Sequence, residues 1–206
     1  MAGKRAVFLD RDGTVNREKE YLHRTEEFEF IPGAPEAIRL LKDAGFLVIV
    51  VTNQSGIGRG LVDMASLNAV HRHMMQLLAE KGGRIDAVFF CPHAPDEECD
   101  CRKPLPGLML QIAERYGIDG GLSDVPMVCD TARDLRAAQA AGCEPHLVRT
   151  GRAAALSPDQ LAQWLAGIER VQVHADLAAC AEFLVHREHE LLGVVGEDSR
   201  PTPLTP

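Results

Sequence analysis

The sequence of 206 residues lacks the long apolar runs and the basic excess that mark two large classes of protein. It contains no run of about 18 uncharged apolar residues, so we expect no membrane-spanning helix. Acidic residues outnumber basic residues by 30 to 22, which gives a formal net charge of −8. Because nucleic acid and anionic membranes attract a basic surface, we expect neither to be a partner. A local basic pocket for a small anion remains compatible with this charge.

The N-terminal segment also lacks the apolar core of a signal peptide, since Asp10 follows only a few apolar residues. We therefore expect a cytoplasmic protein. In a reducing cytosol, the six cysteines are expected to be free thiols or metal ligands rather than disulfides.

Short apolar runs alternate with segments of helical pattern along most of the chain. The strand candidates are residues 5–9, 46–51, 85–90, 126–129, 145–151 and 171–173. The helix candidates are residues 32–45, 63–81, 107–117, 131–142, 156–167 and 176–185. This alternation predicts an α/β fold with a mostly parallel sheet flanked by helices. We expect residues 1–186 to form a single domain and residues 187–206 to form a loosely ordered tail.

Polar side chains stand at the ends of three of these strands. Asp10 and Asp12 follow the first strand, Thr52 follows the second, and Asp130 follows the strand at 126–129. Ligands bind at the carboxyl ends of the strands in parallel sheets, so we expect these groups to converge on one edge.

The segment FLDRDGTV at 8–15 places two carboxylates at i and i+2, which can point to the same side of an extended chain. If they are buried together, Asp10 and Asp12 repel strongly, so a cation or a shared proton is expected beside them. Gly13 permits a sharp turn directly after them. An acidic turn that ends a strand explains an isolated motif of this kind equally well.

The segment VVTNQSGIGRG at 50–60 offers backbone N–H groups to an anion. It has neither the Gly-Lys-Ser/Thr of a Walker A loop nor the spacing of a dinucleotide fingerprint. Taken alone, an ordinary turn between a strand and a helix is the better interpretation. Asp130 and Asp134 likewise fit simple capping of the helix at 131–142.

The order of these motifs nevertheless resembles the haloacid dehalogenase-like (HAD) phosphatases, over roughly residues 5–150. The resemblance implies a Rossmann-like HAD core and phosphoryl transfer through an aspartyl-phosphate. It implies Asp10 as the nucleophile and Asp12 as the general acid and base. Thr52 is expected to hydrogen-bond the transferring phosphoryl group, and Lys103 to steady its charge.

The same resemblance implies a catalytic Mg²⁺ ion. Its expected ligands are the carboxylates of Asp10 and Asp130 and the backbone carbonyl of Asp12. Asp134 is expected to lie next to these ligands without binding the ion itself. An oxygen-only site suits Mg²⁺, and its charge offsets the repulsion between a carboxylate and a phosphate dianion.

A second group of ligand residues is crowded into residues 91–101. The spacing Cys91-x-His93-x₅-Cys99-x-Cys101 supplies three thiolates and one imidazole, which suits tetrahedral Zn²⁺. A catalytic zinc usually keeps one position open to water, whereas four protein ligands leave none. We therefore predict a structural zinc loop, with unrelated thiols as the alternative.

The loop runs directly into Arg102 and Lys103, so a closed zinc site would hold that lysine in place. This combination resembles the heptose bisphosphate phosphatases and their relatives, the histidinol-phosphate phosphatases. It implies a minimal cap and removal of the 7-phosphate from a heptose 1,7-bisphosphate, in the supply of lipopolysaccharide heptose. We expect a monomer.

Short loops would then hold the substrate. The expected contacts are Glu18, Tyr21, Asn53, Gln54, Ser55 and Arg102. A guanidinium fork can bind a second phosphate bidentately, which suits Arg102, although a plain exposed arginine explains that residue alone.

One residue departs from the family pattern. Cys129 stands where the family has glycine before its metal-binding aspartate, so it could crowd the metal or shift the backbone. We predict that activity is retained, and that Cys129, like Cys143 and Cys180, is an ordinary buried residue. The alternatives are a histidinol-phosphate phosphatase, a catalytically silent phosphate-binding protein and, against the acidic balance, a nucleic-acid 3′-phosphatase.

Overall fold

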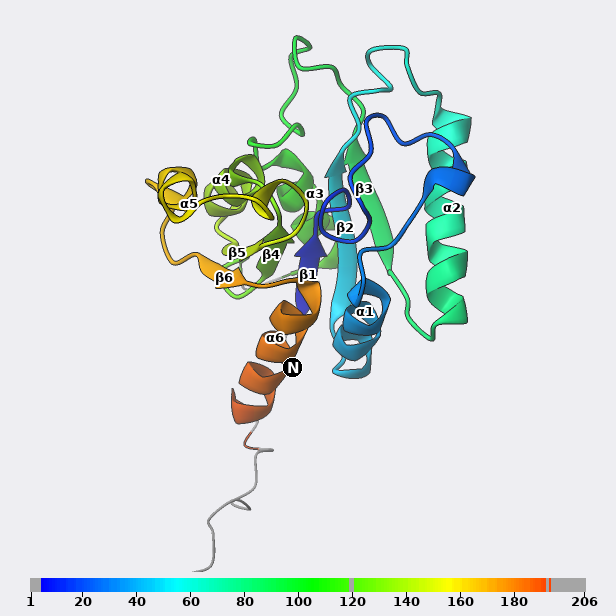
Figure 1. Cartoon of the computed structure of the whole chain (residues 1–206). Coiled ribbons are helices and arrows are strands. Elements are labelled where there is room, and N and C mark those ends of the chain that lie inside the picture. The colour runs from blue at the N-terminus through cyan, green and yellow to red at the C-terminus, as the bar shows by residue number, and fades with distance from the viewer. Residues whose placement is uncertain (1–4, 119–120, 192, 194–206) are drawn as a thin grey trace, which may run out of the picture.

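The computed structural model describes residues 5–118, 121–191 and 193. Six strands form one parallel sheet in the order β3-β2-β1-β4-β5-β6 (Figure 1). They are β1 (Ala6–Leu9), β2 (Leu47–Asn53), β3 (Ala87–Cys91), β4 (Pro126–Cys129), β5 (Glu144–Val148) and β6 (Gln172–His174). The predicted α/β class and parallel sheet are confirmed.

Six α-helices connect and flank these strands, with two short 3₁₀ helices in the loops. The α-helices are α1 (Ala34–Asp43), α2 (Met64–Glu80), α3 (Gly107–Tyr116), α4 (Ala132–Ala141), α5 (Pro158–Leu165) and α6 (Leu177–Leu191). The 3₁₀ helices are η1 (Thr25–Glu27) and η2 (Gly151–Ala153).

Alternating side chains of the strands divide the core into two halves. Val7 and Leu9 of β1 pack in the cluster with α1, α2 and α6, whereas Ala6 and Phe8 pack in the cluster with α3 and α4. Helices therefore cover both faces of the sheet, and the strands read as continuous apolar runs for that reason.

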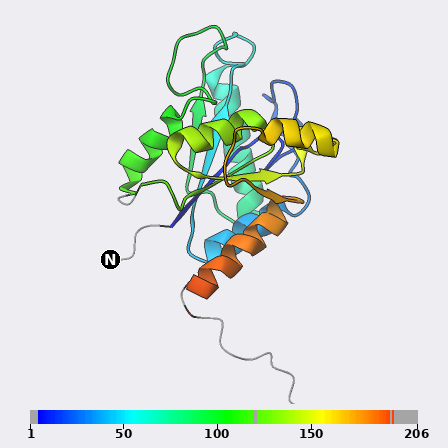
Figure 2. The ribbon, with the colours of Figure 1, turned by 90° about the vertical axis from the view of Figure 1, so that its left-hand side faces the viewer.

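The sheet order reverses between β1 and β4, which lie side by side. A parallel sheet has its ligand crevice at such a switch point, outside the carboxyl ends of the strands. The loops after β2 and β3 project beyond this end of the sheet in both views (Figures 1 and 2). In the described chain these two loops contain no helix or strand, and the segment between β1 and α1 contains only the three-residue η1, which agrees with a minimal cap.

The C-terminal helix is longer than the sequence predicted. α6 extends to Leu191, so residues 187–191 are helical rather than part of a loose tail. Arg187 and Glu188 explain the extension, because they pair with Glu144 and Arg5 respectively and tie this turn to the sheet side of the fold. The rest of the predicted tail, apart from residue 193, lies outside the described residues. Among the described residues, no helix combines the length and apolar character needed to cross a membrane.

Glu144, the first residue of β5, links that strand to α6. Its carboxylate lies 3.3 Å from His146 Nε2 and accepts hydrogen bonds of 2.7 and 2.8 Å from Arg187 Nη1. The interaction with His146 and then the Arg187 contacts lower the pKa of Glu144 from 4.5 to about 2, against the opposing effect of burial.

We expect Glu144→Gln to lower the free energy of unfolding at pH 7 by about 1–2 kcal/mol, allowing for partial solvent screening. A depressed folded-state pKa stabilises the protein above the unfolded-state value and loses this effect as pH falls through about 2. The difference from the wild type, measured by urea unfolding at several pH values, should therefore shrink below pH 4.5.

Glu29→Gln is the matched control, because Glu29 pairs with Arg17 on an exposed surface. Its effect should stay below about 0.5 kcal/mol at each pH. An equal effect of Glu144→Gln at pH 3 and pH 7 would contradict the assignment.

Candidate active site

A buried ion cluster occupies the carboxyl edge between β1, β2 and β4. Lys103 Nζ lies 2.7 Å from Asp10 Oδ1 and 2.8 Å from Asp134 Oδ1, and it donates to Val51 O at 2.8 Å. Lys103 is 1% exposed and Asp10 6%. Burial opposes the ammonium charge, but Asp10 and Asp134 dominate and raise the pKa of Lys103, so the lysine remains charged.

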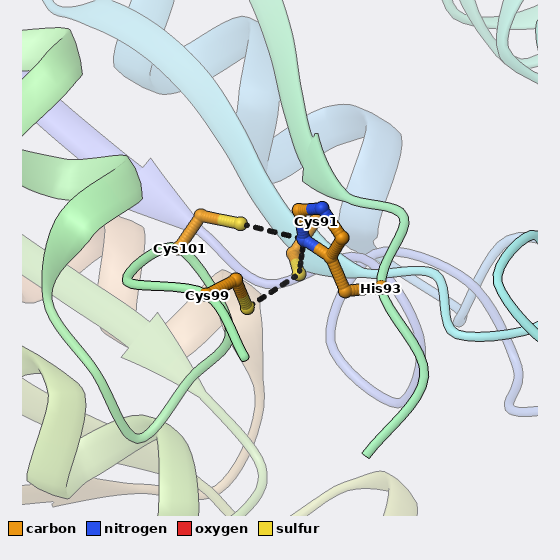
Figure 3. A group of neighbouring side chains, drawn as sticks. All are labelled: Cys91, His93, Cys99 and Cys101. Carbon is orange, nitrogen blue, oxygen red and sulfur yellow. Dashed lines mark hydrogen bonds between the residues drawn. The ribbon is translucent and has the colours of Figure 1, made fainter. Parts of the chain in front are cut away.

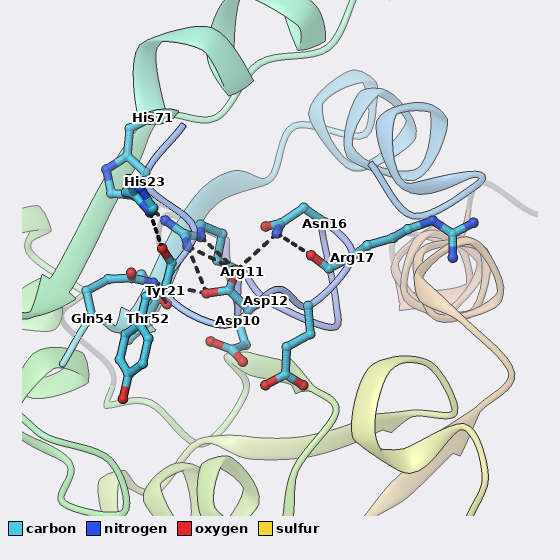
Figure 4. A network of polar contacts seen from close by, with 12 residues as sticks. Asp10, Arg11, Asp12, Asn16, Arg17, Tyr21, His23, Thr52, Gln54 and His71 are labelled. Atoms are coloured by element: carbon cyan, nitrogen blue, oxygen red, sulfur yellow. Dashed lines mark hydrogen bonds and ion pairs between the residues drawn. The ribbon is translucent and has the colours of Figure 1, made fainter. Parts of the chain in front are cut away.

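Asp12 lies beside this cluster but is held by a different set of donors (Figure 4). Its carboxylate accepts hydrogen bonds from Arg11 at 2.9–3.3 Å, from Asn16 Nδ2 at 3.0 Å and from Gln54 Nε2 at 3.0 Å. Burial raises the pKa of Asp12, but Arg11 and these hydrogen bonds together lower it below its ordinary value. The described contacts therefore favour the ionised form.

Arg11 was not singled out from the sequence, yet it is fully buried. Its Nη1 lies 3.0 Å from His71 Nε2 on α2, while its Nη2 contacts Asp12 (Figure 4). Burial and the neighbouring guanidinium lower the pKa of His71 to about 4, so its neutral ring can accept from Arg11. The contact joins residues 60 positions apart, and the sequence carried no signal for it.

Thr52 and Gln54 continue the same network. Gln54 Nε2 donates to both Thr52 Oγ1 and Asp12 Oδ2 at 3.0 Å. Thr52 is 1% exposed and lies in the last part of β2, next to β1, which ends at Leu9 just before Asp10. The predicted convergence of the strand ends is thus observed.

Asp130 follows β4 and is buried between two glycines. A Cβ added at Gly13 or at Gly151 would lie 2.1 Å from Asp130 Oδ2. The same oxygen accepts a 2.8 Å hydrogen bond from Arg152 N. The N-cap of α4 is Thr131, so Asp130 does not cap that helix as the alternative interpretation proposed.

Charge at this edge is not balanced by the protein alone. Ligand atoms of Asp10, Asp130 and Asp134 lie within 4.8 Å of one another, and Asp134 is already paired with Lys103. Burial and then the Asp10 carboxylate raise the pKa of Asp130 to about 8. Burial, with a smaller effect of Asp134, raises the pKa of Asp10 to about 6 against the opposing effect of Lys103. Asp130 Oδ1 is buried and has no hydrogen-bond partner within the described ranges. Buried carboxylate oxygens in this state fit a hard divalent cation.

The four ligand side chains of the 91–101 loop meet at one point (Figure 3). Cys91 Sγ lies 3.5 Å from His93 Nδ1 and 3.9 Å from Cys99 Sγ, and His93 Nδ1 lies 3.2 Å from Cys101 Sγ. Tetrahedral Zn²⁺ with bonds of about 2.0–2.3 Å requires ligand separations of roughly 3.3–3.8 Å. The donor set and spacing therefore fit zinc.

A cavity of about 600 Å³ opens above the ion cluster and contains every predicted substrate contact. Those residues are Glu18, Tyr21, Asn53, Gln54, Ser55 and Arg102. Asp10, Asp12, Thr52 and Asp130 also line it, whereas Lys103 and Asp134 lie beneath.

Besides Arg11, three more cavity arginines were not predicted from the sequence: Arg59, Arg133 and Arg152. Arg133 Nε is buried with no hydrogen-bond partner in the described part of the chain, and Arg152 pairs with Glu18 across the cavity wall. Arg102 donates to His93 O at 3.2 Å, which ties it to the metal-ligand loop. No spacing rule marks these residues, since isolated arginines are common on surfaces.

Comparison with known proteins now decides the family. The D-glycero-beta-D-manno-heptose-1,7-bisphosphate 7-phosphatase of Bordetella bronchiseptica is 48% identical over 87% of this chain and 97% of its own. Its namesake from Pseudomonas aeruginosa is 48% identical over 71% of this chain and 82% of its own. The chain belongs to this heptose bisphosphate phosphatase family.

Solved structures and family models agree with the HAD assignment. The D,D-heptose 1,7-bisphosphate phosphatase from B. bronchiseptica, complexed with magnesium and phosphate, matches with a TM-score of 0.81 and 46% identity. The match covers 89% of this chain and 99% of the Bordetella chain. A HAD-hydrolase-like model matches residues 100–179, and a polynucleotide kinase 3 phosphatase model matches residues 5–133. The chain is accordingly a phosphatase of the HAD type.

Cys129 stands where the family pattern has glycine, and its side chain packs in the core. Cys129 packs in the cluster with α3 and α4, and its Sγ lies 3.8 Å from Thr131 O and 3.7 Å from His146 O. Close approach to Asp130 comes instead from Gly13 and Gly151. Cys143 and Cys180 are buried as predicted, and all six cysteines of the described chain are free.

We expect Gly151→Ala to reduce magnesium-dependent phosphatase activity at least tenfold, because a methyl group there must displace the Asp130 carboxylate. The requirement for added Mg²⁺ should rise in the same variant. Activity titrated against magnesium concentration measures both effects.

Gly142→Ala separates backbone strain from this steric clash. Gly142 also has a positive φ, of 80°, but an added Cβ would meet nothing within 4 Å. It should cost about 1 kcal/mol of stability and leave the magnesium response unchanged. Equal magnesium responses in the two variants would overturn the steric argument.

Proposed function

We propose that this phosphatase hydrolyses the 7-phosphate of D-glycero-beta-D-manno-heptose 1,7-bisphosphate. The names of the relatives support this substrate, and so does one observation in the cavity. Its walls carry the Asp10 centre together with Arg59, Arg102 and Arg133, which are suited to a second anionic group on the same small molecule. A sugar with one phosphate leaves such groups unpaired.

We propose that Asp10 attacks the phosphorus atom. A bond forms between its carboxylate oxygen and phosphorus while the bond from phosphorus to the C7 oxygen breaks. Lys103 offsets the negative charge that Asp10 and the phosphoryl oxygens bring together, and Thr52 offers its hydroxyl to one of those oxygens. Water then attacks the aspartyl-phosphate, which releases phosphate and restores Asp10.

Asp12 serves both steps in this scheme. It gives a proton to the leaving alkoxide in the first step and takes one from water in the second. The donors from Arg11, Asn16 and Gln54 match the ionised form that the second step uses. Proton donation requires Asp12 to be protonated and turned away from some of these donors.

Magnesium fits the carboxylate edge, and we propose that Asp10, Asp130 and the Asp12 carbonyl hold it. Bound there, the ion supplies charge neutralisation for the phosphoryl group. Asp134 supports this set indirectly, since its ion pair fixes Lys103 against Asp10.

We further propose that Cys91, His93, Cys99 and Cys101 bind a structural zinc ion. The four-donor set and its separations support this choice. Burial and the neighbouring thiols raise the pKa of Cys101 to about 12, so a cation is needed to hold that sulfur as a thiolate. A cytoplasmic monomer is our proposal for its state in the cell, and the free cysteines of the described chain fit a reducing compartment.

A substrate panel with added Mg²⁺ tests the proposed reaction. It contains the α and β anomers of heptose 1,7-bisphosphate, histidinol phosphate and a 3′-phosphorylated oligonucleotide. We expect the highest kcat/KM for the β-heptose bisphosphate. Faster hydrolysis of histidinol phosphate would favour the related activity, and faster hydrolysis of the oligonucleotide would follow the polynucleotide phosphatase model.

Asp10→Asn should abolish turnover of every substrate in the panel, with a fall of at least 10³-fold in kcat. Unchanged activity would remove Asp10 as the nucleophile. Wild-type protein that binds these compounds without hydrolysing them would instead indicate a silent binding protein.

Cys99→Ser tests the zinc site. We expect loss of about one zinc per chain by elemental analysis, a melting midpoint lower by several degrees and at least tenfold lower activity. Added Mg²⁺ should rescue neither property, because it binds elsewhere. Glu98→Gln, an exposed neighbour on the same loop, is the control and should resemble the wild type. Full activity in zinc-free protein would refute the scaffolding role.

A further inference from the structure

Lys103 lies in a segment with little regular structure, although its ammonium group is fixed by three oxygens. Residues 92–106, between β3 and α3, contain no helix or strand. Nevertheless, Lys103 Nζ contacts Asp10, Asp134 and Val51 at 2.7–2.8 Å. A displacement of about 1 Å in a catalytic group can cost about 10²-fold in rate. The backbone of this residue therefore needs a restraint of its own.

Asn53, the last residue of β2, supplies that restraint with its side chain. Asn53 Oδ1 accepts from Lys103 N at 3.1 Å, and Asn53 Nδ2 donates to Lys103 O at 3.1 Å. The amide thus pairs with both backbone groups of Lys103, as a neighbouring strand would. Val51, two residues earlier on the same strand, accepts from the lysine ammonium group. The end of β2 therefore contacts both the backbone and the ammonium group of Lys103.

The backbone of Asn53 is also anchored beside the first cysteine of the metal-ligand loop. Asn53 pairs in register with Cys91 of β3, and Gln54 N donates to Cys91 O at 2.8 Å. The loop from Cys91 to Lys103 is consequently closed at both ends on Asn53. This closure uses backbone groups of Cys91 and Lys103, whereas the cysteine and histidine cluster brings side chains together from Cys91 to Cys101.

We propose that Asn53 is a positioning residue for Lys103 rather than a contact for the sugar. Its amide oxygen and one amide hydrogen are committed to the lysine backbone, which leaves a single N–H for anything in the cavity. Loss of Asn53 therefore acts on the transition state, where Lys103 meets the transferring phosphoryl group. The proposal rests on the proposed phosphoryl chemistry at Asp10 but not on the identity of the sugar.

The test compares Asn53→Ala with Ser55→Ala in the magnesium-loaded enzyme. Both residues line the cavity, but the Ser55 side chain makes no hydrogen bond to the described residues. We expect Asn53→Ala to lower kcat about 10- to 100-fold with KM changed less than about threefold. Ser55→Ala should move KM more than kcat, as a substrate contact does.

A transition-state analogue gives a readout that a merely structural role would not move. In Asn53→Ala, the Kd for orthovanadate should rise by about the factor that kcat falls, while the Kd for inorganic phosphate changes little. Asn53→Asp keeps the acceptor for Lys103 N and loses the donor, so its kcat should lie between those of the wild type and Asn53→Ala. If the alanine variant does not fold, Asn53→Asp can be compared with the wild type in its place.

Two results would overturn the proposal. A raised KM with unchanged kcat would make Asn53 a substrate contact, and wild-type values of both would remove any role in positioning. Measuring each variant on p-nitrophenyl phosphate as well separates this proposal from the sugar assignment. If the wild type cleaves only that probe, the heptose reaction fails while the effect of Asn53 is still measured.

Discussion

The ion pair between Lys103 and the buried carboxylates is the constraint on which the rest of this site depends. Asp10, Asp130 and Asp134 lie within 4.8 Å of one another, and Lys103 is the ammonium group that touches two of them. One ammonium group does not offset three fully ionised carboxylates in a buried setting, and the pKa values of Asp10 and Asp130 are accordingly raised. A divalent cation at this edge would favour the ionised form of both carboxylates, and it would also offset the charge of a phosphoryl group brought to Asp10.

Lys103 differs from the other members of the cluster in the part of the chain that carries it. The other members of the cluster stand at strand ends or on α4, where the backbone is fixed by the sheet and by helix packing. Lys103 alone comes from a loop, and two devices replace the missing secondary structure. The cluster of Cys91, His93, Cys99 and Cys101 brings the two arms of the loop together. The Asn53 amide joins the loop to β2. The proposed zinc ion, closed by these four ligands, would on this basis support the Lys103 side chain rather than bind a substrate.

The architecture and the ends of the strands were predictable, because apolar runs of strand length and the parallel-sheet rule are local and general. Asp10, Thr52 and Asp130 were correctly brought to one edge on those grounds alone. The roles of Asn53 and Gln54 were not predictable, since one ends β2 and the other follows it, where either side chain could face substrate or protein. The Arg11 contact with His71 and the approach of Gly151 to Asp130 join distant parts of the chain, and no periodicity marks them. The α6 boundary was missed because its last turn depends on ion pairs with other elements.

The position of Cys129 shows how the sheet decides which changes the site tolerates. Side chains alternate along β4, so Val128 packs toward α1 and α6, and Met127 and Cys129 pack toward α3 and α4. The side chain that Cys129 has and glycine lacks therefore packs in the core and does not enter the cavity. Gly13 and Gly151 have no such freedom, because each faces the Asp130 carboxylate from outside the sheet. A side chain is therefore accommodated at residue 129, whereas one at Gly13 or Gly151 would collide with Asp130.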